Sequence, residues 1–392
     1  MDLTEAHRLL FCDEPAYPLN AAAPPIFQTS LFTFDSYQDM AAVYAGEQRL
    51  VYTRGDNPTV QVFEELVARL EGADAGRGFA SGMAAITATV MAFVSGGDRL
   101  VTVCNVYGDA YKMFEKLLRP AGVTIDYVDG SDPEAVARAL PGAKMLYVET
   151  PTTLTFELQH LPTLAALAQQ HGVVTAIDNS WATPLYQNPI AHGIDLVIHA
   201  ASKYLGGYSD TVAGVVVGRQ DLIDRINGRT YPYLGAKLSP FDAFLLVRGL
   251  RSLTLRMPVH MSSGMTIARR LRDHPEVTSV LHPAFSSHPG RETLTGYGGV
   301  FSFLVSDAID VPAFADALRL IRLGVSWGGP ESLLVPLSVT AGMPPAPNPF
   351  VHFGISDRMI RLNVGLEPVD AIWSDLEQAL EHAAKSGNRF SQ

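Results

Sequence analysis

The sequence is poor in cysteine and in positive charge, and it lacks any long apolar run. Its 392 residues include only two cysteines, Cys12 and Cys104, which rules out a disulfide framework and gives no metal-ligand spacing, so we expect no metal site. No stretch approaches the ~18 apolar residues of a membrane helix, and the N-terminus, with its early acid, is unlike a signal peptide. Lys and Arg number 29 against 40 Asp and Glu, which argues against binding nucleic acid or anionic membranes through bulk charge. We therefore expect a cytoplasmic protein with neither nucleic acid nor membrane as partner.

The composition and length predict two domains preceded by an arm. Hydrophobic residues make up 47% of the chain, which is enough for a large core, and domains usually contain ~100–200 residues. Residues 1–55 are irregular and rich in proline and aromatic residues, so we expect an arm that lies on another surface. We expect a large domain over residues 56–245 and a smaller one over residues 246–392.

The middle of the chain alternates between two hydrophobic patterns. Helical periodicity runs over residues 60–72 and 81–94, and short apolar segments occupy 99–103, 144–150 and 173–179. Apolar strands that alternate with helices are typical of an α/β fold with a mostly parallel sheet covered on both faces. After about residue 245 the pattern changes to a long helix, separate strands and a closing amphipathic helix, which indicates a smaller α+β domain.

A carboxylate and a lysine stand out as a candidate catalytic pair. Asp178 ends an apolar strand, and the carboxyl ends of such strands form the ligand crevice of open α/β sheets. Lys203 follows 25 residues later within A-S-K-Y-L-G-G, a setting of small residues that is unusual for a solvated charge. This pair suits pyridoxal 5′-phosphate, because a lysine amine condenses with its aldehyde and a carboxylate keeps its ring nitrogen protonated.

The same cofactor needs a site for its phosphate. Ser81-Gly82-Met83 opens the helix expected over residues 81–94, and a glycine there lets an anion approach the unpaired amides of the first turn. Ser202 adds a hydroxyl next to Lys203. These residues predict a phosphate-binding cup beside the lysine.

With these motifs in place, the chain resembles the Cys/Met-metabolism (trans-sulfuration) family of pyridoxal-phosphate enzymes. That family includes cystathionine β-lyase, cystathionine γ-synthase and methionine γ-lyase, and the resemblance runs from about Pro24 to Glu367. It implies the type I, aspartate aminotransferase-like fold of PLP-dependent transferases. It also implies a homotetramer built from two catalytic dimers, with the arm contacting a neighbouring subunit.

The resemblance also assigns roles to individual residues. Lys203 would hold the cofactor and move protons, while Tyr107 in N-V-Y-G-D would stack on the cofactor ring and take part in proton transfer. Tyr52 and Arg54 in Y-T-R would reach the phosphate of the neighbouring subunit's cofactor. The full set of cofactor-binding residues implied in this way is Lys203, Asp178, Tyr107, Gly82, Met83, Ser202, Tyr52 and Arg54.

The substrate side of the site is implied by two segments near the C-terminus. Arg361 in R-L-N-V-G-L-E matches the arginine that binds the substrate α-carboxylate, a role that suits a bidentate guanidinium. Ser326 in S-W-G-G-P-E-S would help to position that carboxylate, with Val325 and Trp327 beside it.

Departures from the family pattern bear on which reaction is catalysed. Thr153 stands where many relatives have asparagine, and together with Trp181 and Trp327 this resembles one bacterial type of cystathionine β-lyase. The two tryptophans either narrow the mouth of the site or serve only in packing. Val325 argues against cystathionine as the substrate, because an apolar residue cannot pair with its distal ammonium. In this resemblance, methionine γ-lyases and sulfhydrylases have valine at the same position.

We therefore expect a PLP-dependent carbon–sulfur lyase. The first choice is β-elimination of cystathionine or a related cysteine S-conjugate to a thiol, pyruvate and ammonia. The alternative is γ-elimination or γ-replacement, as in methionine γ-lyase, cystathionine γ-synthase, cystathionine γ-lyase or an O-acylhomoserine sulfhydrylase. A remote alternative is a binding protein that keeps the fold without catalysis.

Overall fold

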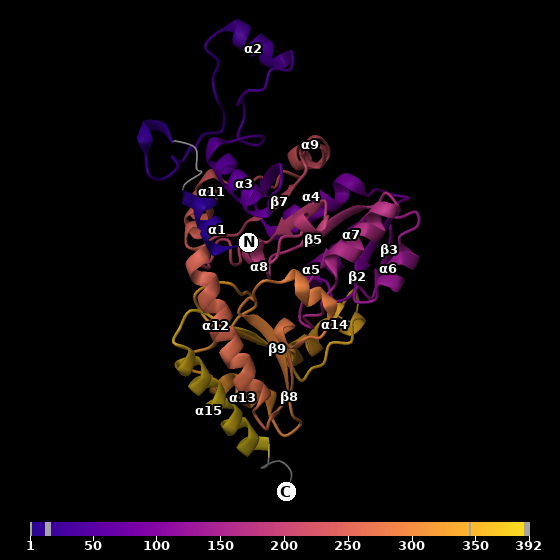
Figure 1. Cartoon of the computed structure of the whole chain (residues 1–392), viewed down its shortest axis with the longest axis vertical. Coiled ribbons are helices and arrows are strands. Elements are labelled where there is room, and N and C mark those ends of the chain that lie inside the picture. Colours follow the sequence, from indigo (N-terminus) through magenta and orange to yellow (C-terminus); the bar gives the residue numbers. More distant parts are fainter. Residues whose placement is uncertain (1, 12–16, 345, 388–392) are drawn as a thin grey trace.

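Two β-sheets organise the chain, one in each half (Figure 1). The computed structural model describes residues 2–11, 17–344 and 346–387, so Cys12 lies outside the described residues. The first sheet has the order β1-β7-β6-β5-β4-β2-β3, and all its pairings are parallel except the two made by β7. Its strands are β1 (Ala75–Phe79), β2 (Arg99–Val103), β3 (Thr124–Val128), β4 (Met145–Glu149), β5 (Val174–Asp178), β6 (Leu196–His199) and β7 (Gly214–Gly218).

Helices follow the strands of the first sheet and bury its apolar faces. Cores of buried residues lie on both faces of this sheet, and one of them continues without a break into the second sheet. The helices are α3 (Pro58–Glu71), α4 (Gly82–Phe93), α5 (Gly108–Met113), α6 (Pro133–Ala139), α7 (Leu161–Gln170), α8 (Thr183–Tyr186), α9 (Gln220–Arg229), α10 (Tyr231–Leu234) and α11 (Pro240–Arg251).

The second sheet is smaller and mostly antiparallel. Its order is β10-β11-β12-β9-β8, and only the short pairing between β10 and β11 is parallel. The strands are β8 (Val277–Leu281), β9 (Val300–Val305), β10 (Arg322–Leu323), β11 (Leu333–Pro336) and β12 (Met359–Asn363). The accompanying helices are α12 (Leu253–Arg272), α13 (Val311–Ala317), α14 (Pro349–His352) and α15 (Val369–Gly387).

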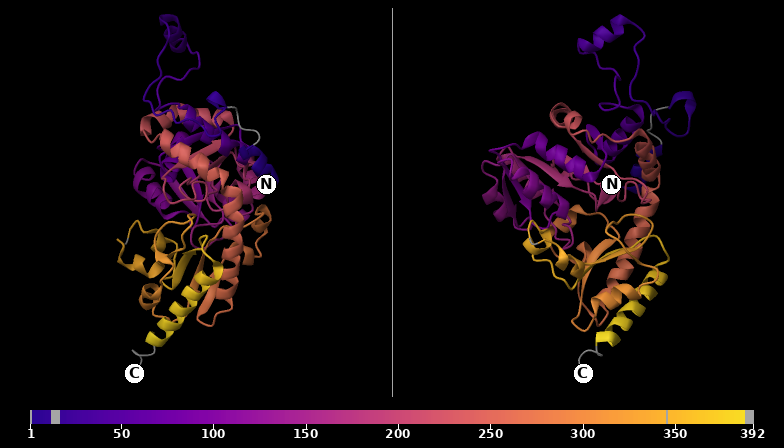
Figure 2. Two further views of the ribbon diagram at one scale, coloured as in Figure 1. Left: turned by 90° about the vertical axis from the view of Figure 1, so that its left-hand side faces the viewer. Right: turned by 180° about the vertical axis from the view of Figure 1, so that it is seen from behind.

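The N-terminal segment departs from the expectation of an irregular stretch. It contains two helices, α1 (Leu3–Phe11) and α2 (Tyr37–Tyr44). Helix α1 packs into the core through Ala6 and Leu10, whereas α2 projects away from the rest of the chain, as both views in Figure 2 show. Tyr37 and Tyr44 on α2 are 85% and 82% exposed.

The expected α/β pattern is confirmed. Strand β2 has the bounds read from the sequence, and α3 ends where Gly72 adopts a left-handed conformation with φ of 71°. Strand β1 was missed, because its sequence A-G-R-G-F has two glycines and no alternation of apolar residues. The domain limits at residues 55 and 245 stay predictions. None of the helices in the described ranges is long and apolar enough to cross a lipid bilayer.

Candidate active site

Lys203 lies in the turn after β6, where the two sheets meet. Its Nζ donates a hydrogen bond to Ser326 Oγ at 2.8 Å and lies 5.3 Å from the centre of the Trp327 ring. Both partners belong to the loop between β10 and β11, and Ser326 lies 123 residues further along the chain than Lys203. The tertiary structure therefore brings the lysine and the loop of S-W-G-G-P together.

Gly328 explains how closely this loop approaches the lysine. It has φ of +87°, and a Cβ at this position would lie 2.8 Å from the backbone N of Tyr204 and 2.9 Å from the carbonyl carbon of Lys203. Only glycine meets both conditions without strain. The loop is also held by Asn363 at the end of β12, whose Oδ1 accepts from the Gly328 N–H at 3.2 Å.

The surroundings of Lys203 favour its neutral amine. Burial and the nearby Arg361 guanidinium lower the pKa of Lys203 to about 8, against the opposing effect of Asp178. A lysine with such a pKa is partly neutral near pH 7. Its amine can therefore attack an aldehyde without a separate base.

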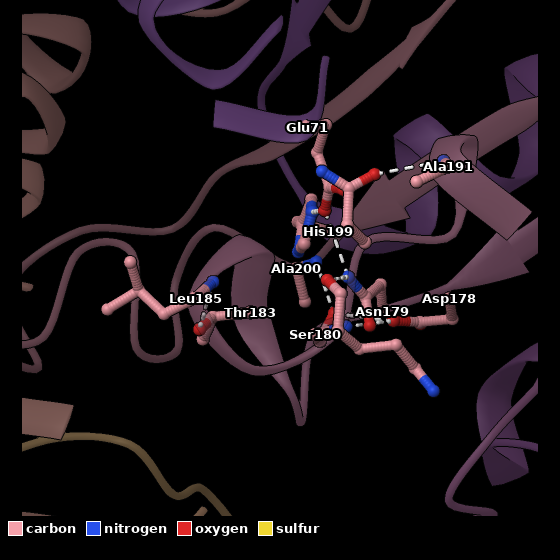
Figure 3. Close-up of polar contacts among 11 residues, drawn as sticks. Glu71, Asp178, Asn179, Ser180, Thr183, Leu185, Ala191, His199 and Ala200 are labelled. Carbon is pink, nitrogen blue, oxygen red and sulfur yellow. Dashed lines mark hydrogen bonds and ion pairs between the residues drawn. The ribbon is translucent and has the colours of Figure 1, made fainter. Parts of the chain in front are cut away.

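Asp178 is held in one orientation at the end of β5. Ser180 donates to Asp178 Oδ1 through both its N–H (2.9 Å) and its Oγ (2.5 Å), and Ser180 Oγ accepts from the Ala200 N–H at 2.6 Å (Figure 3). Burial raises the pKa of Asp178, while Ser180, His199 and Lys203 act in the opposite direction. A cationic ring nitrogen facing this carboxylate would compensate for its burial.

Behind Asp178 lies a buried polar cluster that the sequence reasoning missed. Glu71 Oε1, at the end of α3, accepts from Asn179 Nδ2 at 2.9 Å and lies 2.8 Å from His199 Nε2 (Figure 3). All three side chains are buried. The cluster ties α3 to the ends of β5 and β6. The available signal was polar residues at the ends of two apolar strands.

Glu149 is a second residue that the sequence reasoning missed. It ends β4 directly beside Asp178 in the sheet register, and its Oε2 accepts the Tyr107 N–H at 2.7 Å. Thr153 Oγ1 donates to its other oxygen at 2.5 Å, so the threonine that stands in place of asparagine is bound to this glutamate. Burial and the charge of Asp178 raise the pKa of Glu149 to about 8.

Tyr107 is partly exposed at the start of α5. Its hydroxyl donates to Asp109 Oδ2 at 3.1 Å, and its side chain is half-exposed. Burial and the neighbouring Asp109 raise the pKa of the phenol, so it stays protonated near neutral pH.

The N-terminus of α4 is where we expect the phosphate of the cofactor to bind. Ser81 Oγ accepts from the Ala84 N–H at 3.0 Å, which leaves the Gly82 and Met83 N–H groups without an acceptor in the described part of the chain. A Cβ at Gly82 would lie 2.8 Å from Ala200 Cβ, so the glycine allows α4 to approach the turn before Lys203. The Ser202 hydroxyl exchanges hydrogen bonds with the backbone of Ala213, and its contact with the phosphate stays a prediction.

Arg361 on β12 faces the lysine from the second sheet. Its guanidinium donates to the Val325 carbonyl at 2.6 Å, and burial lowers its pKa to about 10. Its Nε is buried and has no hydrogen-bond partner among the described residues. An unsatisfied buried donor of this kind is suited to a carboxylate ligand.

The two tryptophans have different places. Trp181 is buried, donates from Nε1 to the Val300 carbonyl at 2.8 Å and packs near Phe156 and His282. It joins the two sheets rather than lining the site. Trp327 lies against Tyr204, next to the Lys203 amine.

Taken together, these groups suit pyridoxal phosphate. Lys203 supplies an amine of lowered pKa, Asp178 a buried carboxylate, and Gly82 and Met83 two unpaired amides. Lysine, carboxylate and anion cup therefore match the aldehyde, ring nitrogen and phosphate of that cofactor.

Comparison with known proteins agrees with this geometry. A family described as Cys/Met metabolism PLP-dependent enzymes matches residues 12–381. The chain belongs to this family. It is 37% identical to an L-methionine γ-lyase of Pseudomonas putida over 93% of this chain and 94% of that protein. It is 36% identical to a cystathionine β-lyase of Lactococcus lactis, over 92% and 94% respectively.

The solved structures give the same result for the fold. A cystathionine γ-synthase from Xanthomonas oryzae pv. oryzae, in complex with aminoacrylate and cysteine, superposes with a TM-score of 0.89 at 32% identity and 99% coverage of both chains. The expected fold class and the dependence on pyridoxal phosphate are thus confirmed. The reaction is not resolved by this similarity, because relatives of nearly equal identity are named for γ- and β-elimination.

Tyr52 and Arg54 are not brought to the site within one protomer. Both are exposed, and the Arg54 guanidinium lies 5.2 Å from the centre of the Tyr52 ring. Among the described residues, no hydrogen bond joins either of them to Lys203, Asp178 or the start of α4. The role that the family resemblance implies for Tyr52 and Arg54 stays a prediction.

Proposed function

We propose that the protein is a carbon–sulfur lyase that performs β-elimination on cystathionine or a related cysteine S-conjugate. The observation that carries this proposal is the Lys203 amine, whose pKa is lowered to about 8 and which bonds to Ser326 between Asp178 and Arg361. With cystathionine, the substrate and one water would give homocysteine, pyruvate and ammonia.

The chain's own residues account for binding and proton transfer. Arg361 would bind the substrate α-carboxylate through its unpaired Nε, and Ser326 fixes the position of the Lys203 amine. When bound, pyridoxal phosphate withdraws electrons from that carbon through its ring. Lys203 then removes the α-proton as general base, a contribution of typically ~10²–10⁴-fold. Asp178 would stabilise the positive charge on the protonated ring nitrogen of the bound cofactor.

β-Elimination asks for fewer proton transfers from this set of residues than γ-elimination does. A neutral phenol bonded to Asp109 is suited to donate a proton to the departing sulfur, and Lys203 then remains as the base for the α-proton. Loss of the thiol from Cβ needs only this one proton abstraction. Elimination from Cγ needs a further one at Cβ.

Val325 supports the alternative within the family. It is 84% exposed and apolar, and it lies next to Ser326 at the entrance to the site. An apolar residue there is compatible with a thioether such as methionine, and so with γ-elimination or γ-replacement. The relatives include enzymes named for each of these reactions.

Product identification with cystathionine tests the proposal. Pyruvate with homocysteine indicates β-cleavage, and 2-oxobutyrate with cysteine indicates γ-cleavage. A product that appears only with an O-acylhomoserine and an added thiol indicates replacement. No turnover of any sulfur amino acid by cofactor-loaded protein would indicate the non-catalytic alternative.

The assignment of Lys203 has its own test. Lys203→Ala should abolish turnover and the visible absorbance of the lysine-bound cofactor, whereas the exposed Lys116→Ala should change neither. Retention of either property by Lys203→Ala would contradict the assignment.

We also propose a homotetramer of two catalytic dimers, in which Tyr52 and Arg54 complete the phosphate site of the neighbouring subunit. Their exposure on the arm and their separation from the site of their own protomer support this arrangement.

A further inference from the structure

Arg77 is a buried arginine outside the site described above. It lies on β1, and its side chain is 12% exposed. Its Nε donates to Asn227 Oδ1 on α9 at 2.7 Å, and its Nη1 donates to the Gly55 carbonyl at 2.9 Å and to Asp56 Oδ1 at 3.0 Å. Glu64 on α3 lies 3.7 Å from the same nitrogen. Two helices, a strand and the turn at residues 55–56 thus meet at one guanidinium.

The backbone around Arg77 is built for this contact. A Cβ at Gly76 would lie 2.9 Å from the Glu64 carbonyl oxygen, and one at Gly78 would lie 2.9 Å from a Leu238 methyl group. The two glycines therefore let β1 approach α3 closely enough for the Gly78 N–H to donate to Glu64 at 2.7 Å. Such a buried, charged arrangement is costly unless it fixes a specific geometry.

The turn that Arg77 holds is the one that carries Tyr52 and Arg54. The Tyr52 carbonyl accepts from the Gly55 and Asp56 N–H groups at 2.9 and 3.2 Å, so the two residues bonded to Arg77 close this turn. On its other side, Asn57 Nδ2 donates to the Phe27 carbonyl at 2.9 Å and fastens the arm to the same place. Arg77 thus fixes the turn to the large sheet, while Tyr52 and Arg54 on the same turn are exposed to solvent.

We propose that Arg77 is a positioning residue for the neighbouring subunit's cofactor site, acting through the Tyr52–Asp56 turn. The proposal rests on the proposed role of Tyr52 and Arg54 across the subunit interface. The side-chain hydrogen bonds of Arg77 go to Asn227, Gly55 and Asp56, and not to Lys203, Asp178 or the start of α4. It fixes the direction in which the turn presents those two side chains to the second subunit.

A local role must be separated from this one. Strand β1 leads directly to Ser81, the N-cap of the anion-binding helix, so damage at Arg77 could also weaken phosphate binding within its own subunit. In the local role, loss of Arg77 weakens cofactor binding in the same subunit, whereas in the proposed role it weakens cofactor binding in the neighbouring subunit. Hybrid oligomers distinguish them.

The test uses two subunits with different affinity tags, one with Arg77→Gln and the other with Lys203→Ala, co-expressed and purified through both tags. The remaining Lys203 belongs to the Arg77→Gln subunit, and its site receives Tyr52 and Arg54 from a subunit with intact Arg77. The affinity for pyridoxal phosphate is measured by titrating the apoprotein and following the visible absorbance of the lysine-bound cofactor. Arg54→Ala with Lys203→Ala is the reference hybrid, and Arg138→Gln, an exposed arginine, is the matched control.

We expect the Arg77→Gln homo-oligomer to bind the cofactor at least tenfold more weakly than wild type, as Arg54→Ala does. In both hybrids, the one site that keeps Lys203 should bind the cofactor with wild-type affinity. Each pair of subunits should then contain one active site. Arg77→Lys should recover part of the affinity, because it keeps the charge but not the fork of donors. Arg138→Gln should behave as wild type.

The outcomes separate this proposal from the one on which it rests. If Arg54→Ala is rescued in the hybrid and Arg77→Gln is not, Arg77 acts within its own subunit and the inference is wrong alone. If Arg54→Ala leaves the cofactor affinity unchanged, or if the hybrid does not restore that affinity, the proposed role of Tyr52 and Arg54 in the neighbouring site is wrong. The inference about Arg77 is then wrong as well. Unchanged affinity in Arg77→Gln also overturns it. If Arg77→Gln does not fold, Asp56→Asn, at a half-exposed residue on the turn itself, takes its place under the same criteria.

Discussion

At the scale of single residues, burial and the charge of Arg361 together adjust the reactivity of Lys203. Together with burial, it lowers the pKa of Lys203 to about 8. Because only the neutral amine attacks the aldehyde, cofactor uptake by the apoprotein should accelerate as the pH rises through 8 and then level off. Arg361→Gln removes a positive charge, so the pKa of Lys203 should rise and the profile should shift to higher pH. Uptake at pH 7 should fall several-fold, measured by stopped-flow absorbance.

The exposed Arg322→Gln is the control for this prediction, since it lies on the same sheet away from the lysine. Its pH profile should match that of wild type. A profile that is flat between pH 7 and 9 in the wild-type protein would contradict the lowered pKa of Lys203.

Glu149 gives a prediction about stability. Its pKa is raised from 4.5 to about 8, so between these values the folded apoprotein binds a proton that the unfolded chain has lost. Its contribution to stability is therefore full below pH 4.5 and is lost as the pH rises towards 8. The side chain of Glu149→Gln is always neutral. The difference in the free energy of unfolding between this variant and wild type should therefore increase in favour of the variant from pH 5 to pH 8, by at least about 1 kcal/mol.

Urea unfolding of the apoprotein at the two pH values measures this gain. Glu157→Gln, at an exposed carboxylate on the following segment, should show no such dependence. If the difference between Glu149→Gln and wild type is the same at both pH values, Glu149 is ionised throughout and the raised pKa is wrong.

At the scale of elements, the loop between β10 and β11 determines where Ser326 and Trp327 stand. Gly328→Ala places a Cβ against the backbone of Lys203 and Tyr204 at a positive φ, with a cost of about 1–3 kcal/mol. The loop must move, so kcat/KM should fall by about tenfold or more while the cofactor stays bound. Steady-state kinetics and the visible spectrum measure the two effects.

Gly342→Ala is the matched change, because nothing lies within 4 Å of a Cβ there. It should leave kcat/KM within twofold of wild type. Equal kinetics in the two variants would mean that the loop adapts and that its contact with Lys203 does not position Ser326.

Elements also show where sequence patterns are informative. Helix α3 was predicted well because its apolar face, its N-terminal Pro58 and its terminal Gly72 agree. Strand β1 was missed because its place in the sheet depends on pairing with the distant strand β7, in which Ala75 lies opposite Gly218, and not on its own composition. Glu149 was missed for a similar reason, since its partner Tyr107 comes from a different strand's loop.

At the scale of the whole molecule, the exposed arm predicts an assembly. Tyr37 and Tyr44 are exposed on a helix that projects from the rest of the chain, and we expect them to be buried against another copy of the chain. The double change Tyr37→Asp and Tyr44→Asp should reduce the mass measured by light scattering from that of a tetramer. The control Ser279→Asp, on the exposed side of β8, should leave the mass unchanged. A tetramer that persists in the double variant would show that α2 is not part of an interface.

The sequence by itself determined the α/β class, the strand that ends in Asp178, the small-residue segment around Lys203 and the helix that follows Ser81. These depend on local periodicity and on residues close to one another in the chain. The tertiary structure alone decided that Ser326 and Arg361 meet the lysine, that Glu149 holds Tyr107, that Trp181 joins the sheets, and that Arg77 anchors the arm. Each of these contacts joins residues distant in the chain, and their meeting follows from strand order and domain packing, which no local pattern encodes.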